Sequence, residues 1–571
     1  MQNGKVIGER SEKMLKLPYG ISNYEEIIRD GYEYVDKTEY IEKLENLSEK
    51  RIMFLRPRKF GKTLFTSVLE NYYDVKKIDK FEELYGNTYI GKNPTENKNK
   101  YYILRFNFSR IDTSTVESTI NGFKNEVLSS IQVFVSKYSI DFYVNWEQEA
   151  ENVLDNLIKS FGVQRGNEKI YVIIDEYEHF ANELLGFAPD KFRDLVSKNG
   201  KVRKWYEILK KGTETVIDRI FITGVAPITL DSLTSGFNIG KDITQDSRFN
   251  EMMGFTQEEL IEMLNRQKIS KEEQKEILPI MKNNYDGYKF SIGANKQIYN
   301  SNMCLYFLSE YIWSREIPSR LIDMNIASDY SKLGNMLDLC VGENREEILE
   351  RTISGEGIES EITEKFNPAI EFTEKDMISM LYYLGYLTIA GEEFGYPKLK
   401  IPNIVMKEIY SDYFIKAIKK VINININENY VQITKEIAQD GKIDKILELL
   451  KTYINNLSNR DLIKFDEKYV KLIFYCISMN LNLYRVKSEM EVQRKYPDLL
   501  LIPKQKPEEY YSVMIEFKYL KKEEKNKLEE KQKEAKEQIK EYSKFEEIKS
   551  LHKLRKYTVV AVNDEIYIEE I

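Results

Sequence analysis

Four short apolar runs in the first 230 residues are predicted as strands buried on both faces of a sheet, because each is continuous and followed by polar residues. They lie at 51–55, 101–108, 170–174 and 219–223. Between them, 64–73 and 116–138 repeat apolar residues at the spacing of an amphipathic helix. Strands that alternate with helices predict an α/β fold with a mainly parallel sheet and helices on both faces.

The pattern becomes mostly helical from 258 to about 420. Within it, a helix at 377–386, a hairpin at 387–401 and a helix at 405–415 follow one another. This order is typical of a winged helix, and equally of a local packing element made of helices and a hairpin.

The chain changes character again after 421–429, a stretch biased toward Ile and Asn that favours a domain boundary. Helices are predicted to about 483, and strand patterns then return. The run 521–549 interrupts these strands; it is highly charged and predicts a solvated helix with ion pairs one turn apart.

Composition and charge narrow the function. The chain has 571 residues, 42% hydrophobic and 31% charged, with a net charge of −8, so a uniformly basic surface for nucleic acid is excluded and a local patch is needed. Three cysteines and two histidines, far apart, disfavour a zinc site or a Cys/His nucleophile and favour a reducing cytoplasm. No secretory signal or membrane span is expected.

A phosphate-binding loop is predicted directly after the strand 51–55. Gly61 lets the backbone approach phosphates, Lys62 reaches the β- and γ-phosphates, and the Thr63 hydroxyl holds Mg²⁺ at the start of a helix. The pattern GxxxxGK[ST] is imperfect, since Arg56 stands at its first glycine. A chance Gly-Lys-Thr in a loop is the alternative.

Two acids at the end of the strand 170–174 suit a second part of a nucleotide site. Asp175 would bind Mg²⁺ through water and Glu176 would polarise the attacking water, although a strand can also end on two acids in an ordinary turn. Thr223, at the end of another strand, is placed to touch the γ-phosphate or the water. Arg248 either supplies charge to the transition state or is a surface arginine.

A second chemical site is predicted near the C-terminus. The apolar stretches 499–502 and 510–518 read as a hairpin. Because side chains alternate along a strand, Glu516 and Lys518 share one face, and Asp498 at the start of the partner strand can converge on them. Carboxylate oxygens suit Mg²⁺, and a lysine beside the metal can orient water. Glu-x-Lys is also frequent in any chain rich in both residues.

The N-terminal motifs resemble the AAA-ATPase-like family of mostly bacterial proteins over roughly 17–259. The resemblance rests on 35–38 (VDKT), 56–63 (RPRKFGKT), 174–176 (IDE) and 223–225 (TGV). The family loop similarly lacks the first glycine, so Arg56 agrees with it. The resemblance implies ATP and Mg²⁺ as cofactors and Glu176 as the catalytic carboxylate that polarises the attacking water. It also implies nucleotide contacts from Arg58, Gly61, Lys62, Thr63, Asp175 and Thr223, with Thr63 and Asp175 as metal ligands.

The C-terminal motifs resemble the PD-(D/E)XK nuclease superfamily over about 480–571. The resemblance implies Glu489, Asp498 and Glu516 as metal ligands and Lys518 as the catalytic lysine. Asp498 and Glu516 are expected to be catalytic as well. Gln538 lies where the superfamily often has a helical glutamine, in a stretch rich in Glu, Lys and Gln.

Together these features predict five parts and two enzymatic sites. The parts are a tail at 1–16, a P-loop NTPase domain at 17–250, a helical and winged-helix-like region at 251–420, a helical linker at 421–480, and a restriction-endonuclease-like α/β domain at 481–571. We expect an ATP-hydrolysing, Mg²⁺-dependent nuclease of the bacterial cytoplasm that acts on DNA in preference to RNA, binds no membrane and can form oligomers. The alternatives are a nucleotide-switched interaction protein with little turnover and a nucleic-acid-binding module with an inactive nuclease fold.

Overall fold

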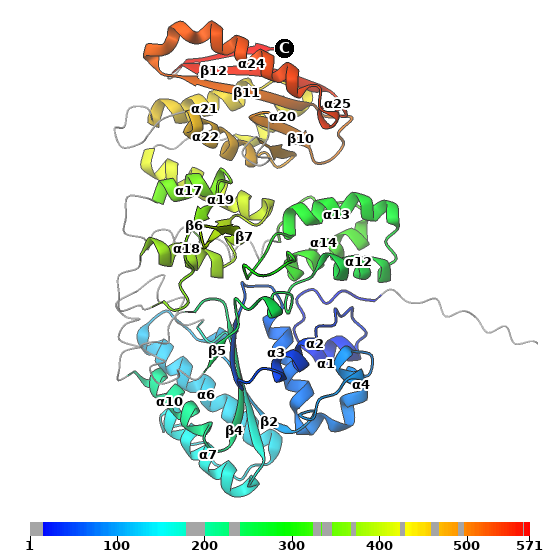
Figure 1. Ribbon diagram of the computed structural model, residues 1–571, viewed down its shortest axis with the longest axis vertical. Coiled ribbons are helices and arrows are strands. Elements are labelled where there is room, and N and C mark those ends of the chain that lie inside the picture. The colour runs from blue at the N-terminus through cyan, green and yellow to red at the C-terminus, as the bar shows by residue number, and fades with distance from the viewer. Residues whose placement is uncertain are drawn as a thin grey trace, which may run out of the picture. The chain divides into compact units, whose positions relative to one another are not determined.

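The computed structural model describes residues 15–178, 200–227, 240–323, 333, 345–366, 373–422, 429–457, 467–488, 496–562 and 565–571 (Figure 1). The described residues fall into two compact units. The first contains 15–323 and 359–403 apart from the gaps, and the second contains 345–358 and 404–571. Each unit has its own five-stranded sheet, and the strands 358–359, 388–393 and 396–400 form a third, three-stranded sheet.

A five-stranded parallel sheet forms the centre of the first unit, in the order β2-β3-β4-β1-β5. Its strands confirm the four predicted runs within one or two residues. They are β1 (Arg51–Leu55), β2 (Tyr101–Asn107), β3 (Lys169–Asp175), β4 (Ile217–Gly224) and the short β5 (Lys241–Asp242). In β3 every residue after the first is buried, as expected for a strand covered on both faces.

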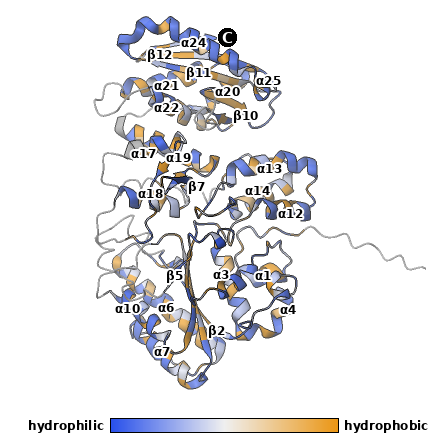
Figure 2. Cartoon of the chain, viewed as in Figure 1, coloured by the Kyte–Doolittle hydropathy of each residue, from blue (hydrophilic) through white to orange (hydrophobic). Residues whose placement is uncertain are grey.

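Helices cover both faces of this sheet, so the predicted fold class is confirmed. Figure 1 shows α6 (Val116–Tyr138), α7 (Ala150–Arg165) and α10 (Lys201–Gly212) on one side and α3 (Lys62–Tyr73) on the other. Figure 2 shows the sheet strands mainly in orange, because they carry the apolar side chains of the core.

Short helices fill the spaces around α3. The segment before the sheet forms α1 (Tyr24–Arg29) and α2 (Glu39–Glu45). After α3 come η1 (Val75–Lys80), α4 (Phe81–Tyr85) and α5 (Tyr89–Lys92), and further 3-10 turns are η2 (Phe108–Arg110) and η3 (Ser247–Phe249). Buried tyrosines pack these elements together, including Tyr24, Tyr72 and Tyr85.

The helical middle region is confirmed by α12 (Gln257–Arg266), α13 (Lys271–Tyr285) and α14 (Ser301–Ser314). The predicted helix, hairpin and helix are also present, as α18 (Glu374–Tyr383), β7 (Thr388–Glu393) with β8 (Tyr396–Lys400), and α19 (Ile404–Ile422). Since α19 belongs to the second unit, the winged-helix interpretation stays a prediction.

The second unit contains a five-stranded mixed sheet in the order β13-β12-β11-β10-β9. Only β11 and β12 pair in parallel. The strands are β9 (Tyr484–Lys487), β10 (Leu499–Pro503), β11 (Ser512–Leu520), β12 (Leu554–Val562) and β13 (Glu565–Glu570). The register of Leu499 with Ile515 confirms the predicted hairpin.

Helices precede and interrupt this second sheet. They are α17 (Arg345–Ile353), α20 (Tyr430–Asp440), α21 (Asp444–Leu457), α22 (Glu467–Met479), η4 (Lys522–Lys527), α24 (Leu528–Tyr542) and α25 (Glu546–Lys549); β6 (Ile358–Glu359) is a short strand. Helix α24 is mostly blue in Figure 2 and lies in the predicted charged run. No helix among the described residues is long and apolar enough to cross a membrane. The predicted five-part division stays a prediction.

Candidate functional site

The phosphate loop joins β1 to α3, and its backbone needs the glycine that the sequence provides. Gly61 has φ +95°, in the left-handed region, and is the N-cap of α3. The helix therefore begins at Lys62 with its free amides at the loop. The helical middle region fastens the loop from outside, because the carbonyl of Lys59 accepts from Ser301 and the carbonyl of Phe60 accepts from the Gly254 amide.

Lys62 lies under this loop. Its ammonium is buried and donates to the carbonyls of Arg56 and Pro57 at 3.1 and 3.2 Å. Its Nζ is 3.7 Å from Oε1 of Glu176. The two predicted functional side chains, from separate strand ends, are thus brought together.

Arg56 does not face the loop opening. It is 1% exposed and donates to three carbonyls, those of Leu55, Thr244 and Phe249, at 2.8, 2.9 and 3.0 Å. The guanidinium also lies over the rings of Phe54 and Phe290, and burial lowers its pKa to about 9. The residue that replaces the first glycine of the pattern is therefore an internal brace of the loop.

Asp175 ends β3 in a fully buried position. Burial, and next the charge of Glu176, raise the pKa of its carboxyl, and a hydrogen bond from Thr63 acts in the opposite direction. Its Oδ1 has no hydrogen-bond partner among the described residues. A buried carboxylate oxygen without a donor, beside a hydroxyl, fits the oxygen ligands that Mg²⁺ prefers.

The turn after Asp175 is pinned to the end of β4. The Tyr177 amide donates to the Thr223 carbonyl at 3.2 Å, and Glu178 accepts from the Val225 amide at 2.5 Å. Glu176, between Asp175 and Tyr177, has φ +52°, a strained conformation for a non-glycine residue that is typical of functional sites. Thr223 is buried, and its hydroxyl has no partner among the described residues.

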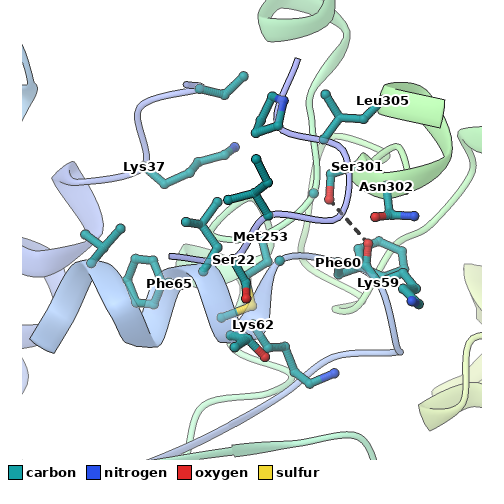
Figure 3. A pocket seen from close by; sticks show the side chains of 18 of the residues that line it. Ser22, Lys37, Lys59, Phe60, Lys62, Phe65, Met253, Ser301, Asn302 and Leu305 are labelled. Atoms are coloured by element: carbon teal, nitrogen blue, oxygen red, sulfur yellow. Dashed lines mark hydrogen bonds between the residues drawn. The ribbon is translucent and has the colours of Figure 1, made fainter. Parts of the chain in front are cut away.

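A pocket of about 580 Å³ opens at this place (Figure 3). Of the predicted site residues, Arg58, Gly61, Lys62, Thr63 and Glu176 line it. Asp175 and Thr223 are fully buried and are not among the lining residues. Arg248 is exposed and paired with Asp246, which agrees with the surface interpretation.

The C-terminal site is also assembled by the fold of its unit. Asp498 Oδ2 accepts from the Phe517 amide at 2.8 Å, and Glu516 Oε2 accepts from the Asp498 amide at 3.4 Å. Lys518 donates to Glu516 Oε1 at 3.1 Å. Burial, and next the charge of Asp498, raise the pKa of Glu516 to about 8. The predicted convergence of these three side chains is therefore present.

Two further groups reach this site from α22. Lys471 donates to Asp498 Oδ1 at 2.7 Å and lies 2.9 Å from Glu467, and Glu467 Oε2 accepts from the Tyr519 amide. The only sequence signal for these roles is the spacing of four residues between Glu467 and Lys471 on one helix. Gln538 of α24 has a buried Oε1 without a partner among the described residues.

The oxygen ligands that the C-terminal site offers fit a divalent cation only in part. Glu489 lies outside the described residues, and within the described part of the chain no group of three or more His, Cys, Asp or Glu could hold a metal ion. Asp498 and Glu516 are nevertheless side by side; burial, and next the charge of Asp498, raise the pKa of Glu516, and a cation would relieve the repulsion between the two carboxylates.

A parallel sheet with a phosphate loop after β1 and an acidic turn after β3 defines a P-loop nucleotide-binding fold. Residues 18–234 match the family described as "Predicted AAA-ATPase", and residues 465–571 match the PD-(D/E)XK nuclease superfamily. The chain therefore combines an AAA-ATPase-like domain with a domain of the PD-(D/E)XK nuclease superfamily, which confirms both resemblances.

Individual proteins resemble the chain more weakly. An "Uncharacterized protein in vnfD 5'region" of Azotobacter chroococcum mcd 1 is 26% identical over 247 residues, which are 42% of this chain and 43% of that protein. The match thus spans less than half of the relative's length. The solved structure of the Aeropyrum pernix ORC2 protein (ADPNP-ADP complexes) has 11% identity and a TM-score of 0.32 over 72% of this chain and 97% of that chain.

Proposed function

We propose that the N-terminal domain binds and hydrolyses ATP with Mg²⁺. One observation carries this proposal: Lys62, Thr63 and Glu176, from two strand ends, line one end of a pocket of about 580 Å³. Lys62 sets a point charge against the phosphates, and the amides that begin α3 add donors to them. Mg²⁺ held by Thr63 and Asp175 would offset the charge of the phosphates.

Glu176 has the place and chemistry to accept the proton of the attacking water. The water oxygen forms the new bond to the γ-phosphorus while the bond to the ADP oxygen breaks, and the water proton passes toward the carboxylate. Its contact with Lys62 at 3.7 Å keeps the carboxylate at the phosphate end of the pocket.

Calorimetry with Mg²⁺ and ATP tests the binding. Lys62→Ala should weaken ATP binding at least about tenfold, or about 1.4 kcal/mol. Lys43→Ala is the control, because Lys43 pairs with Glu39 on α2 and does not line the pocket, so ATP affinity should not change. Equal affinity in wild type and Lys62→Ala removes Lys62 from the site.

Phosphate release tests the hydrolysis. Glu176→Gln keeps the shape of the side chain and removes its charge, so ATP should bind and remain intact. Wild type that binds ATP without turnover, also with DNA present, would favour the nucleotide-switch alternative.

We infer further that the C-terminal domain cleaves phosphodiester bonds, with DNA preferred over RNA as the substrate. A divalent cation held by Asp498 and Glu516 would supply Lewis acidity to the scissile phosphate. Lys518, buried and 3.1 Å from Glu516, is placed to orient the water and offset phosphate charge.

One observation favours the alternative of an inactive nucleic-acid-binding module: both oxygens of Asp498 already accept from protein donors, one of them Lys471. Calorimetric titration with Mg²⁺ or Mn²⁺ separates the two. An active site requires that wild type and Lys518→Ala bind metal, since both carboxylates remain, and that Asp498→Ala does not. Wild type without metal binding would support the inactive module.

A further inference from the structure

The pocket has a second wall that the phosphate chemistry does not use. Besides the phosphate loop, apolar side chains line it, among them Ile21, Val35, Met253, Met263 and Leu305. A concave apolar wall suits the flat face of a nucleobase better than it suits phosphates. The question is what holds this wall in place.

The wall joins two parts of the chain that lie far apart in sequence. One is the segment 15–38, which folds back on itself through the hydrogen bond from the Glu33 amide to the Lys16 carbonyl. The other is α12, which carries Met263, together with the residues just before it; Leu305 is added from α14. Lys37 belongs to the VDKT stretch, which the phosphate chemistry leaves without a role.

Lys37 connects these two parts. Its Nζ lies 2.6 and 2.7 Å from the two carboxylate oxygens of Glu259 and 2.8 Å from the carbonyl of Glu251. An ammonium has three N–H donors, so these acceptors use all of them. Lys37 lines the pocket but is committed to protein partners, and it is therefore unsuited to bind phosphate.

The pair is enclosed, which makes it costly to break. Lys37 is only 9% exposed, and burial lowers its pKa while Glu259 opposes that shift. Figure 3 shows Lys37 across the pocket from Lys59, Ser301 and Asn302.

Glu259 transmits this attachment to α12. Its carboxylate also accepts from the Thr256 amide at 2.8 Å in a capping box, so it fixes the first turn of the helix. Met263 follows four residues later on the same face and lines the pocket. A second ion pair, from Arg266 to Glu33 at 2.6 Å, fastens the other end of α12 to the same segment.

We propose that Lys37 and Glu259 are positioning residues that hold the nucleoside-binding wall, so that they set the affinity for the adenosine part of ATP and not for its triphosphate. The inference rests on the proposed nucleotide site. Lys62 has the complementary role: in the proposed site it contributes to the affinity for the triphosphate and not to that for the adenosine part.

Two ligands distinguish these roles: Mg-ATP and inorganic tripolyphosphate with Mg²⁺, each titrated calorimetrically into the full chain. Lys37→Met and Glu259→Gln should weaken ATP binding at least about tenfold and change tripolyphosphate affinity less than about twofold. Lys62→Ala should weaken both. Lys43→Met is the matched control, because Lys43 is half exposed, pairs with Glu39 on α2 and should leave both affinities unchanged.

The outcomes are separable. An equal fall for both ligands in Lys37→Met, or unchanged ATP affinity, overturns the inference. Should Lys37→Met not fold, Glu259→Gln carries the same test, because glutamine keeps an oxygen for the Thr256 amide. Wild type that binds neither ligand refutes the nucleotide site itself. If Lys62→Ala loses binding while Lys37→Met and Glu259→Gln bind both ligands as wild type does, only the role of Lys37 and Glu259 is refuted.

Discussion

Replacing Arg56 by glycine restores the residue that the phosphate-loop pattern usually has at this position, yet the structure predicts damage. The guanidinium donates to the carbonyls of Leu55, Thr244 and Phe249 and is buried between Phe54 and Phe290. Glycine would remove this donor from all three carbonyls, of which that of Phe249 keeps the Met252 amide at 3.3 Å, and would open a cavity beside the loop.

The magnitude follows from the buried groups. Each buried carbonyl that loses its donor costs on the order of 1–3 kcal/mol. Removing the buried charge of Arg56 also removes the cost of its desolvation, which lowers its pKa to about 9, and this offsets part of the loss. We therefore expect the free energy of unfolding to fall by about 2–4 kcal/mol in Arg56→Gly, with a similar fall in Arg56→Met, which fills space but donates nothing.

Urea denaturation followed by tryptophan fluorescence reports the unfolding of the compact unit that contains Arg56. The chain's three tryptophans, Trp146, Trp205 and Trp313, all belong to this first unit. Lys59→Gly is the control: Lys59 is exposed and has φ +69°, which glycine adopts freely, so stability should not fall. Wild-type stability in both Arg56 variants would refute the bracing role.

Three further outcomes follow from the two sites. Gly224→Ala should lower ATP turnover at least about tenfold with smaller effect on ATP affinity, because its Cβ would lie 1.8 Å from Glu178 Oε2 and displace the acidic turn; phosphate release checks this. Lys471→Met should tighten Mg²⁺ binding in calorimetry, since it removes a cation from the carboxylates, whereas Lys468→Met on the same helix should not. Without metal, Glu516 has a pKa of about 8 in the folded chain against 4.5 ordinarily, so its stabilising contribution is present below pH 4.5 and lost as the pH rises to about 8. Urea midpoints should fall over that range more in wild type than in Glu516→Gln, and an equal fall would contradict the raised pKa.

The sequence predicts the parts of this chain whose signals are local. Continuous apolar runs locate β1 to the residue and β2 to β4 within one or two residues, and the helical spacing locates α6 at both ends. Gly-Lys-Thr follows one such run after the loop residues 56–60, and Asp-Glu follows another directly, so their meeting at one sheet edge follows from parallel pairing.

Roles that depend on distant contacts could not be predicted. The sequence shows that Arg56 replaces a glycine, but its acceptors Thr244 and Phe249 lie 188 and 193 residues away. Lys37 likewise meets Glu259 only through the tertiary fold. Lys471 precedes the hairpin motif on a helix of ordinary composition, and only the packing of α22 against β11 brings it to Asp498.

Cleavage of end-labelled DNA by the full chain, in Mg²⁺ or Mn²⁺ and with or without ATP, tests most directly whether the chain joins a nucleotide site to a nuclease. We predict cleavage by wild type and loss of most of it in both Asp498→Ala and Lys518→Ala, with double variants little worse than single ones because the groups act as one unit. Lys62→Ala should lose only the part that depends on ATP. Cleavage by Asp498→Ala at the wild-type rate, or no cleavage by folded wild type with metal and ATP present, would contradict the account.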